Sequence, residues 1–291
     1  MTADSAALRL TAFAKVNLYL HITGRRPDGY HLLDSLVAFA DIGDEVVIAP
    51  SAQLTLEVDG PFAAALEGDD NLMLSAVRAL AATADRSPAA ALRLTKRLPV
   101  AAGLGGGSAD AAAVLRGLNA LWELGLSVDE LREVGGTLGA DVPVCLESRT
   151  VFMAGIGDEI APTPPLPALP ALLVNPGVAL STADVFAARR QADAAPQRFD
   201  AAPADVRALV GLLAERSNGL EAAARALAPA IGVVLDRLSA LPGVLLARMS
   251  GSGASCFAIF DDMAAARDAD ATLRRQEPLW WTAATRLGAT A

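Results

Sequence analysis

The chain has 291 residues, of which 53% are hydrophobic and 20% are charged, and its net charge is −9. This composition indicates an ordered, alanine-rich globular protein and excludes a disordered chain, while the length favours two packed subdomains over one core. The acidic balance argues against nucleic-acid and anionic-membrane partners, because these partners select basic surfaces.

The first half of the chain is expected to interleave strands and helices. Residues 8–23 alternate apolar and polar side chains, which predicts a strand with Lys15 and Asn17 on the same face. A turn-rich segment at 24–31 follows. Further strands are predicted at 45–49, 54–58, 92–95 and 151–155. Helices are predicted from about Asn71 to Ala84 behind Asp69 and Asp70, from Ser108 toward Gly125, and after the capping-box pair Ser127 and Glu130.

The second half begins after a proline-rich stretch. Residues 161–183 are uncharged for long enough to suggest a membrane span, but their prolines would break the helix that a bilayer requires. We therefore expect a linker that runs into a strand at 172–175. The change in composition places a domain boundary here, between residues 1–160 and 161–291.

The remaining elements complete an α+β pattern in two lobes, because strands and helices interleave without a regular βαβ rhythm. Further strands are expected at 243–249, 254–260 and near 280–285, and helices at 204–216, 220–238 and 263–275. Cys145 and Cys256 lie far apart, which favours buried thiols over a disulfide or a zinc site. The N-terminal residues lack the pattern of a signal peptide, so a cytoplasmic protein is expected.

The loop GLGGGS at 103–108 is the strongest candidate for binding phosphate. It matches neither a Walker A motif nor a dinucleotide fingerprint, yet its glycines allow close backbone approach at the start of a helix. Ser108 could cap that helix and also touch a phosphate or its metal ion. The alternative is a tight strand-to-helix turn with no ligand.

Other candidate residues each have a structural alternative. SGSGAS at 250–255 is either a hairpin turn or a second set of backbone donors. Asp141 is either a helix cap or a general base, and Lys15 is either an edge lysine or a fixed charge near a transferring phosphoryl group. Tyr30 and His31 either anchor their turn or recognise a base. Only two of the 24 basic residues are lysines, Lys15 and Lys96, which favours a specific use for both.

Four stretches together resemble the GHMP kinase superfamily over nearly the whole chain: AKVNLYLHITGRRPDGYH, LPVAAGLGGGSADAA, LGADVPVCL and RMSGSGASCFAIF. The pairing of AKVNLYL with RPDGYH is similar to the kinases of 4-diphosphocytidyl-2-C-methyl-D-erythritol. The resemblance implies a two-domain α+β fold with an N-terminal ribosomal-protein-S5-like ATP lobe and a C-terminal ferredoxin-like lobe. It also implies ATP-dependent phosphorylation of that substrate's 2-hydroxyl in the non-mevalonate isoprenoid route.

The resemblance implies roles for individual residues. Asp141 would act as the base and Lys15 as its electrostatic partner. The ATP loop would comprise Pro99, Val100, Ala101, Ala102, Gly103, Leu104, Gly105, Gly106, Gly107, Ser108 and Ala109, with Asn71 and Lys96 bordering the adenine. The substrate would be bound by Asn17, Tyr30, His31, Thr182 and Phe186. Mg²⁺ is expected with ATP, held by phosphates and Ser108, since no carboxylate ligand is evident.

Two departures from the family pattern affect fine geometry. Val37 stands where relatives often carry a bulky aromatic residue, and Ala101 and Ala102 replace common glycines. A small-molecule substrate is expected, with no nucleic-acid or membrane partner, for a monomer or weak homodimer. Two alternatives stay open, a GHMP kinase acting on homoserine or mevalonate and an inactive nucleotide-binding regulator.

Overall fold

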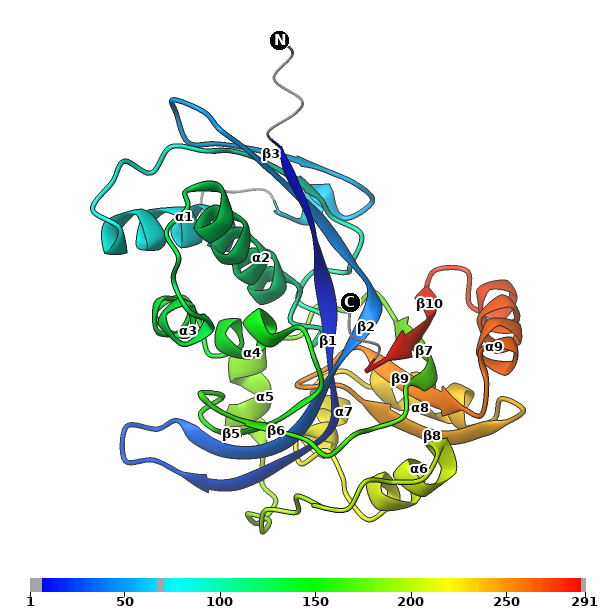
Figure 1. Cartoon of the computed structure of the whole chain (residues 1–291). Coiled ribbons are helices and arrows are strands. Elements are labelled where there is room, and N and C mark those ends of the chain that lie inside the picture. The colour runs from blue at the N-terminus through cyan, green and yellow to red at the C-terminus, as the bar shows by residue number, and fades with distance from the viewer. Residues whose placement is uncertain (1–6, 67–70, 289–291) are drawn as a thin grey trace. The chain divides into compact units, whose positions relative to one another are not determined.

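The computed structural model describes residues 7–66 and 71–288, and the chain within these ranges forms two compact units. Unit 1 takes up the chain as far as Ala14, then Ile42–Val100 and Gly105–Ser148. Unit 2 takes up Lys15–Asp41, Ala101–Leu104 and the chain from Arg149 onward. Two long strands, β1 (Leu8–Arg25) and β2 (His31–Ala49), contribute to both units (Figure 1). The domain boundary expected between residues 160 and 161 stays a prediction.

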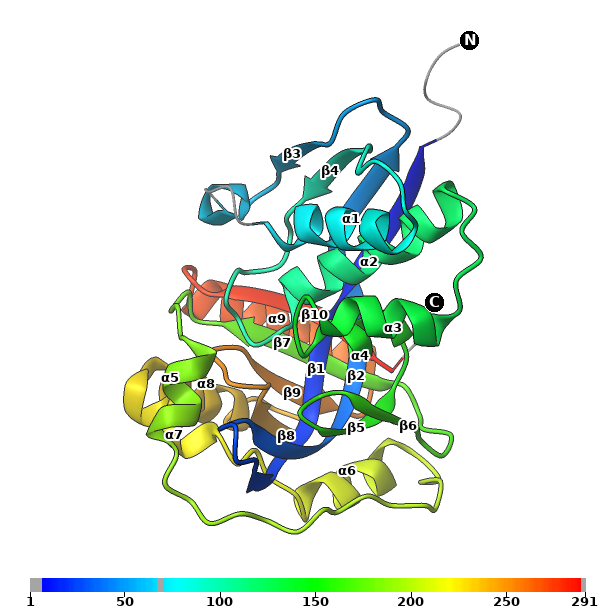
Figure 2. The same cartoon turned by 90° about the vertical axis from the view of Figure 1, so that its left-hand side faces the viewer.

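Unit 1 packs helices against a small sheet (Figure 2). Strand β4 (Ala91–Thr95) lies between β3 (Thr55–Asp59), to which it is parallel, and β2, to which it is antiparallel. The helical elements are η2 (Ala63–Leu66), α1 (Leu72–Thr83), α2 (Gly106–Leu121), α3 (Val128–Gly136) and α4 (Val142–Glu147). Helix α2 approaches the strands closely at Gly117, where an added Cβ would lie 2.4 Å from Ile48 Cδ1. A side chain at this position would require Ile48 to shift.

Unit 2 is built on antiparallel pairs. Strand β2 pairs with β5, and β5 pairs with β6. Strand β2 also pairs with β10, and the sheet then continues in the order β10-β7-β9-β8. The strands are β5 (Val151–Gly155), β6 (Glu159–Pro162), β7 (Leu169–Asn175), β8 (Val244–Met249), β9 (Cys256–Phe260) and β10 (Trp281–Leu287). The helices are α5 (Thr182–Ala188), α6 (Val206–Ala214), α7 (Glu221–Leu227), α8 (Ala230–Ser239) and α9 (Met263–Gln276). The core includes Leu172, Ile231, Phe260 and Leu273, all fully buried.

Several expectations from the sequence are confirmed. The α+β class is correct, Ser127 and Glu130 form a capping box, and Cys145 and Cys256 are both buried. The proline-rich stretch does lead into a strand, β7. Among the described residues, none of the helices is both long and apolar enough to cross a membrane.

Other expectations are wrong in instructive ways. The single helix at 220–238 is two helices, because Pro229 lacks the amide hydrogen needed to continue α7. The strand expected at 45–49 is longer and begins at His31. Its central part is buried on both faces and does not alternate in polarity, so the sequence pattern did not predict it as a strand. Ser108 does not cap α2, because the helix already begins at Gly106 with Gly105 as its N-cap. Asp69 and Asp70 lie outside the described residues.

Candidate functional site

The first half of the glycine loop packs against the loop between β8 and β9. The Ser250 hydroxyl donates to the Gly103 carbonyl at 3.0 Å, and the Ser255 amide donates to the Ala102 carbonyl at 3.0 Å. A Cβ on Gly103, whose φ is +70°, would lie 2.6 Å from the carbonyl oxygens of both Ser250 and Gly253. Glycine is therefore required at 103 by both conformation and space. The contact favours a shared role for the two small-residue loops over two independent turns.

The second half of the loop forms the start of α2 in unit 1. Gly105 is in the left-handed conformation, with φ of 62°, and the first intrahelical bond runs from the Ala109 amide to the Gly105 carbonyl at 2.8 Å. The amides of Gly106, Gly107 and Ser108 therefore have no acceptor within the helix. Together with the helix dipole they can bind an anion such as a phosphate. Ser108 lies in this first turn rather than before it.

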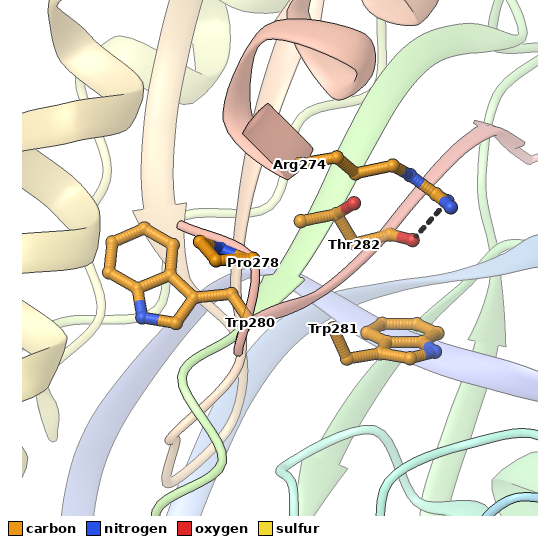
Figure 3. Close-up of a pocket in the computed structure, with 5 residues that line it drawn as sticks. All are labelled: Arg274, Pro278, Trp280, Trp281 and Thr282. Atoms are coloured by element: carbon orange, nitrogen blue, oxygen red, sulfur yellow. Dashed lines mark hydrogen bonds between the residues drawn. The ribbon is translucent and has the colours of Figure 1, made fainter. Parts of the chain in front are cut away.

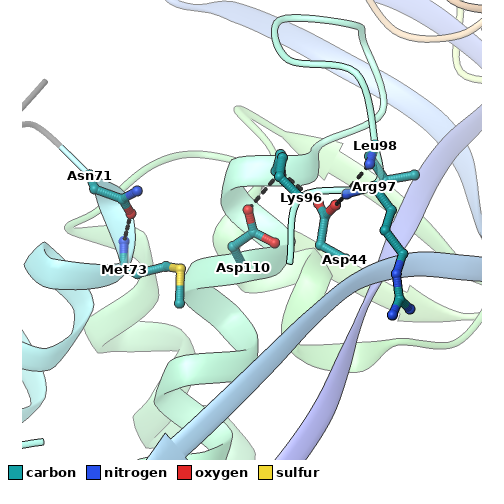
Figure 4. A network of polar contacts seen from close by, with 7 residues as sticks. All are labelled: Asp44, Asn71, Met73, Lys96, Arg97, Leu98 and Asp110. Atoms are coloured by element: carbon teal, nitrogen blue, oxygen red, sulfur yellow. Dashed lines mark hydrogen bonds and ion pairs between the residues drawn. The ribbon is translucent and has the colours of Figure 1, made fainter. Parts of the chain in front are cut away.

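Lys96 lies under the loop in a buried ion-pair cluster (Figure 4). Its ammonium contacts Asp44 Oδ2 at 2.6 Å and Asp110 Oδ2 at 2.7 Å, and its side chain is 2% exposed. A Cβ on Gly106 would lie 3.1 Å from Lys96 Nζ, so the lysine sits directly beneath the first turn of α2. With two carboxylates around it, this ammonium offers no net positive charge to a ligand.

The Asp110 carboxyl has a raised pKa in this cluster. Burial raises its pKa to about 7, and the neighbouring Asp44 carboxylate adds to the shift against the opposing effect of Lys96. Asp110 Oδ1 is buried without a hydrogen-bond partner. Asn71, also predicted to border the adenine, caps α1 by accepting from the Met73 amide at 2.9 Å. Its Nδ2 donors take no part in this cap.

Asp141 stands at the N-terminus of the short helix α4. It occupies the N-cap position, and its side chain makes no capping hydrogen bond to that helix. The helix is anchored at its other end, where Arg116 donates to the Leu146 carbonyl at 3.4 Å and to Ser148. Arg132 also pairs with Glu147. These contacts anchor the C-terminal end of α4 within unit 1.

Lys15 and Asn17 lie side by side on one face of β1, in unit 2. Lys15 is 4% exposed, and its amide donates to the Leu104 carbonyl at 2.8 Å, so the glycine loop meets the strand here. The Asn17 backbone nitrogen donates to Ser250 Oγ at 3.2 Å, and the side-chain Nδ2 atom donates to Ser35 Oγ at 2.8 Å. Asn17 Oδ1 is buried and has no hydrogen-bond partner. The two predicted residues thus lie where the two loops meet.

His31 and Phe186, predicted to hold a base, stack on each other. Their ring centroids are 5.0 Å apart, with 25° between the planes. Burial and the nearby Arg25 and Arg189 guanidinium groups lower the pKa of His31, which favours the neutral imidazole suited to stacking. Tyr30 is 59% exposed and its ring does not join this pair.

Thr182 and Val37 complete the positions predicted from the sequence in unit 2. The Thr182 hydroxyl bonds to the Ser252 hydroxyl at 2.8 Å, which ties the first turn of α5 to the loop between β8 and β9. Val37 is fully buried and pairs with Val151 across β2 and β5. Its side chain therefore belongs to the packing of the sheet.

Ala101 adopts a backbone conformation that favours glycine. Its φ is +51°, in the left-handed region, and the residue is exposed. An L-residue in this conformation is less favourable than glycine by about 1 kcal/mol. Ala102, in contrast, is buried and its φ is not positive.

Arg248 is a supporting residue that the sequence analysis missed. Its guanidinium is buried and donates to the carbonyls of Leu18, Leu213 and Arg216 at 2.6 to 2.9 Å. Burial lowers its pKa to about 10, which still leaves it charged near neutral pH. Arg248 thus ties β1 and the end of α6 to the strand that leads into the SGSG loop. The only signal was an arginine inside the apolar strand GVLLARM.

A separate cavity lies at the turn between α9 and β10 (Figure 3). It is lined by Arg274, Pro278, Trp280, Trp281 and Thr282. The two tryptophans point in opposite directions, and Arg274 donates to the Thr282 carbonyl at 2.8 Å. None of the predicted site residues lines this cavity. Within the described ranges, there is also no cluster of three or more His, Cys, Asp or Glu side chains suited to hold a metal ion.

Comparison with known proteins identifies the class to which this arrangement belongs. The family model "GHMP kinases N terminal domain" matches residues 71–149, and the model "GHMP kinases C terminal" matches residues 201–276. Crystal structures of a homoserine kinase from Cytophaga hutchinsonii and of the L. major mevalonate kinase share the fold, with TM-scores of 0.65 and 0.67 at 18% and 16% identity. They cover 98% and 100% of this chain and are covered over 97% and 99% of their own lengths. The fold is that of the GHMP kinases.

More similar relatives narrow the class. A 4-diphosphocytidyl-2-C-methyl-D-erythritol kinase of Rhodospirillum rubrum is 51% identical over 95% of this chain and 91% of its own length. The enzyme of that name from Paramagnetospirillum magneticum is 48% identical over 96% and 98% of the two chains. A crystal structure of a 4-(cytidine 5'-diphospho)-2C-methyl-D-erythritol kinase has a TM-score of 0.77 at 35% identity, over 97% of this chain and 100% of that one. The chain therefore belongs to the 4-diphosphocytidyl-2-C-methyl-D-erythritol kinase family, and it is a small-molecule kinase.

Proposed function

We propose that the chain transfers the γ-phosphoryl group of ATP to the 2-hydroxyl of 4-diphosphocytidyl-2-C-methyl-D-erythritol, in the non-mevalonate route to isoprenoid precursors. The observation that carries this proposal is the identity of 51% over 95% of the chain to a relative named for that activity. The homoserine and mevalonate kinases share only the fold at 18% and 16% identity, so they do not favour a rival substrate.

We assign the nucleotide to the glycine loop. The amides of Gly106, Gly107 and Ser108 would bind the phosphates at the N-terminus of α2, and the rest of the loop from Pro99 would follow the nucleotide. Asn71 would contact the adenine through its Nδ2 atom. Lys96 would support the loop from beneath, because its ammonium already pairs with two carboxylates. Mg²⁺ would be held by the phosphates and the Ser108 hydroxyl, and would neutralise charge on the transferring group.

We assign the cytidine to the aromatic pair of unit 2. His31 and Phe186 supply stacking surface, with Tyr30 at the adjoining turn and Thr182 at the start of α5. At 5.0 Å between centroids, the two rings leave no room for a base between them. A base must therefore stack on the outside of the pair or displace one ring, because stacked aromatic planes are separated by about 3.5 Å.

We assign the chemistry to Asp141 and Lys15. The Asp141 carboxylate would accept the proton of the 2-hydroxyl as the hydroxyl attacks the γ-phosphorus, and Lys15 would stabilise the negative charge of the transition state. In phosphoryl transfer the protein contributes positioning and electrostatics rather than covalent chemistry. We also propose that the enzyme works in the cytoplasm as a monomer or weak homodimer, without nucleic-acid or membrane partners, as its net charge of −9 supports.

The test is a coupled assay of ADP release with the cytidylated substrate as acceptor. Turnover on that substrate, with much slower turnover on mevalonate and homoserine, is expected. Preference for either of the latter alcohols would reject the proposed acceptor. A pure, folded protein that releases no ADP with any of the three would instead support the inactive regulator.

A further inference from the structure

A buried asparagine side chain with one unsatisfied atom lies where the two small-residue loops meet. Asn17 is 1% exposed, and its Oδ1 atom is buried without a hydrogen-bond partner. A buried acceptor that lacks a donor destabilises the folded protein, so its presence in a well-packed region calls for an explanation. A ligand that brings a donor would supply one.

The orientation of this amide is set by Ser35 on the neighbouring strand β2. The Ser35 hydroxyl is fully buried and donates its single hydrogen to the Tyr19 carbonyl at 2.5 Å. Its oxygen can then only accept from Asn17, and it does so from Nδ2 at 2.8 Å. The reversed amide would place two acceptors against each other. Ser35 therefore selects the orientation in which Oδ1 points away from it.

The surroundings of Oδ1 show where the missing donor would lie. A Cβ placed on Gly251 would lie 3.4 Å from Asn17 Oδ1 and 3.2 Å from the Gly103 carbonyl oxygen. The absence of a side chain at Gly251 thus keeps open a space next to these two acceptors. Two oxygen acceptors about a common point suit a hydroxyl donor better than a phosphate, which is itself an acceptor.

We propose that Ser35 is a positioning residue that holds the Asn17 amide so that Oδ1 accepts a hydrogen bond from a hydroxyl group of the acceptor alcohol. This inference rests on the proposed function, because it assigns the alcohol end of the substrate to Asn17. Ser35 itself does not touch the substrate. Its effect passes through Asn17, and this dependence separates it from a residue that merely stabilises the strands.

A double-mutant cycle tests the dependence. Ser35→Ala frees the amide to rotate, and kcat/KM for 4-diphosphocytidyl-2-C-methyl-D-erythritol is expected to fall about tenfold, the effect of one hydrogen bond, with KM for ATP unchanged. Asn17→Ala is expected to lose more, and adding Ser35→Ala to Asn17→Ala should lose nothing further. Ser35→Thr, which retains the hydroxyl, should restore most of the loss.

Tyr19→Phe is the matched control. It removes another buried hydroxyl hydrogen bond between the same strands, from Tyr19 to Asp34 at 3.2 Å, without touching the Asn17 amide. It is expected to lower the melting temperature but to leave the acceptor kinetics unchanged. An undiminished kcat/KM in Ser35→Ala would overturn the inference. So would a loss of kcat/KM from Ser35→Ala that is equally large in the wild-type and in the Asn17→Ala background.

A second measurement does not depend on the substrate. In the unliganded protein, NMR should show the Asn17 side-chain amide hydrogens protected from solvent exchange, and Ser35→Ala should accelerate that exchange by more than tenfold. Equal exchange in both proteins would contradict the positioning role, whatever the activity. If the wild-type chain did not phosphorylate the cytidylated alcohol while this protection was present, the proposed function would fail and the positioning by Ser35 would stand.

Discussion

The buried cluster of Lys96, Asp44 and Asp110 makes a quantitative prediction about stability. Lys96→Met keeps the volume of the side chain but leaves two carboxylates with exposed fractions of 0% and 4% facing each other. Removing one partner of a buried ion pair costs about 3–5 kcal/mol. Asp44 Oδ1 still accepts from the amides of Arg97 and Leu98 at 2.6 and 2.8 Å, and Asp110 can take up a proton. The loss is therefore expected at the lower end, about 3 kcal/mol.

Asp110→Asn is the matched control for this substitution. Its carbonyl oxygen can still accept from Lys96, and one of the two competing negative charges disappears, so a loss below about 1 kcal/mol is expected. Urea denaturation at pH 7.5 measures both variants. If Lys96→Met were no less stable than Asp110→Asn, the cluster would not stabilise the base of the loop and this reasoning would be refuted.

The same cluster predicts a pH dependence. The ordinary pKa of an aspartic acid is 3.8, and in the folded protein burial raises that of Asp110 to about 7. The folded state therefore holds this proton more tightly, and the associated stability is complete below 3.8 and is lost as the pH rises through about 7. Over that range the wild-type protein should lose stability relative to Asp110→Asn. Parallel curves for the two proteins would contradict the raised pKa.

Three further predictions concern the loops and the aromatic pair. Gly103→Ala should destabilise the protein by about 2 kcal/mol or more, because its Cβ would lie 2.6 Å from two carbonyl oxygens. Gly107→Ala is the control, since an added Cβ there has nothing within 4 Å, and it should be neutral in urea denaturation. Equal losses of stability in the two variants would refute the packing argument. Ala101→Gly should stabilise by about 0.5 kcal/mol, since relief of the left-handed strain exceeds the added chain entropy, and a lower melting temperature would contradict this. Because the pKa of His31 is lowered, the affinity for cytidine diphosphate, measured by calorimetry, should stay constant from pH 8 to 6.5 and fall only at lower pH. A decrease in affinity centred at pH 6.5 would show that the pKa of this imidazole is not lowered.

The sequence predicted local structure well where a local signal existed. The period-two pattern of β1, the capping box at Ser127 and the glycine-rich start of α2 are all consequences of a few adjacent residues. It failed where long-range packing decides the outcome. The strand β2 extends back to His31 because it is buried by other parts of unit 2, and no spacing in its own sequence shows this.

The candidate site divides in the same way. Glycine, asparagine and aspartate near turns identify positions where chemistry is possible, and the structure brings Asn17, Gly103 and Ser250 together. The supporting residues could not be found from one sequence. Ser35 and Arg248 act through hydrogen bonds to residues 16 to 230 positions away, and only the fold creates these contacts. The partners of Lys96 were hidden for the same reason, because Asp44 lies 52 positions from it.

The most direct test of the central claim is the rate of ADP release from ATP and Mg²⁺ with 4-diphosphocytidyl-2-C-methyl-D-erythritol as acceptor, measured for the wild-type chain and for Asp141→Asn. The wild-type chain should turn over and yield the 2-phosphorylated product. Asp141→Asn should bind ATP normally and lose turnover by about 10²-fold or more, since a positioned base contributes that much. Wild-type turnover that survives in Asp141→Asn would contradict the assigned base, and no product from the wild-type protein would contradict the proposed function itself.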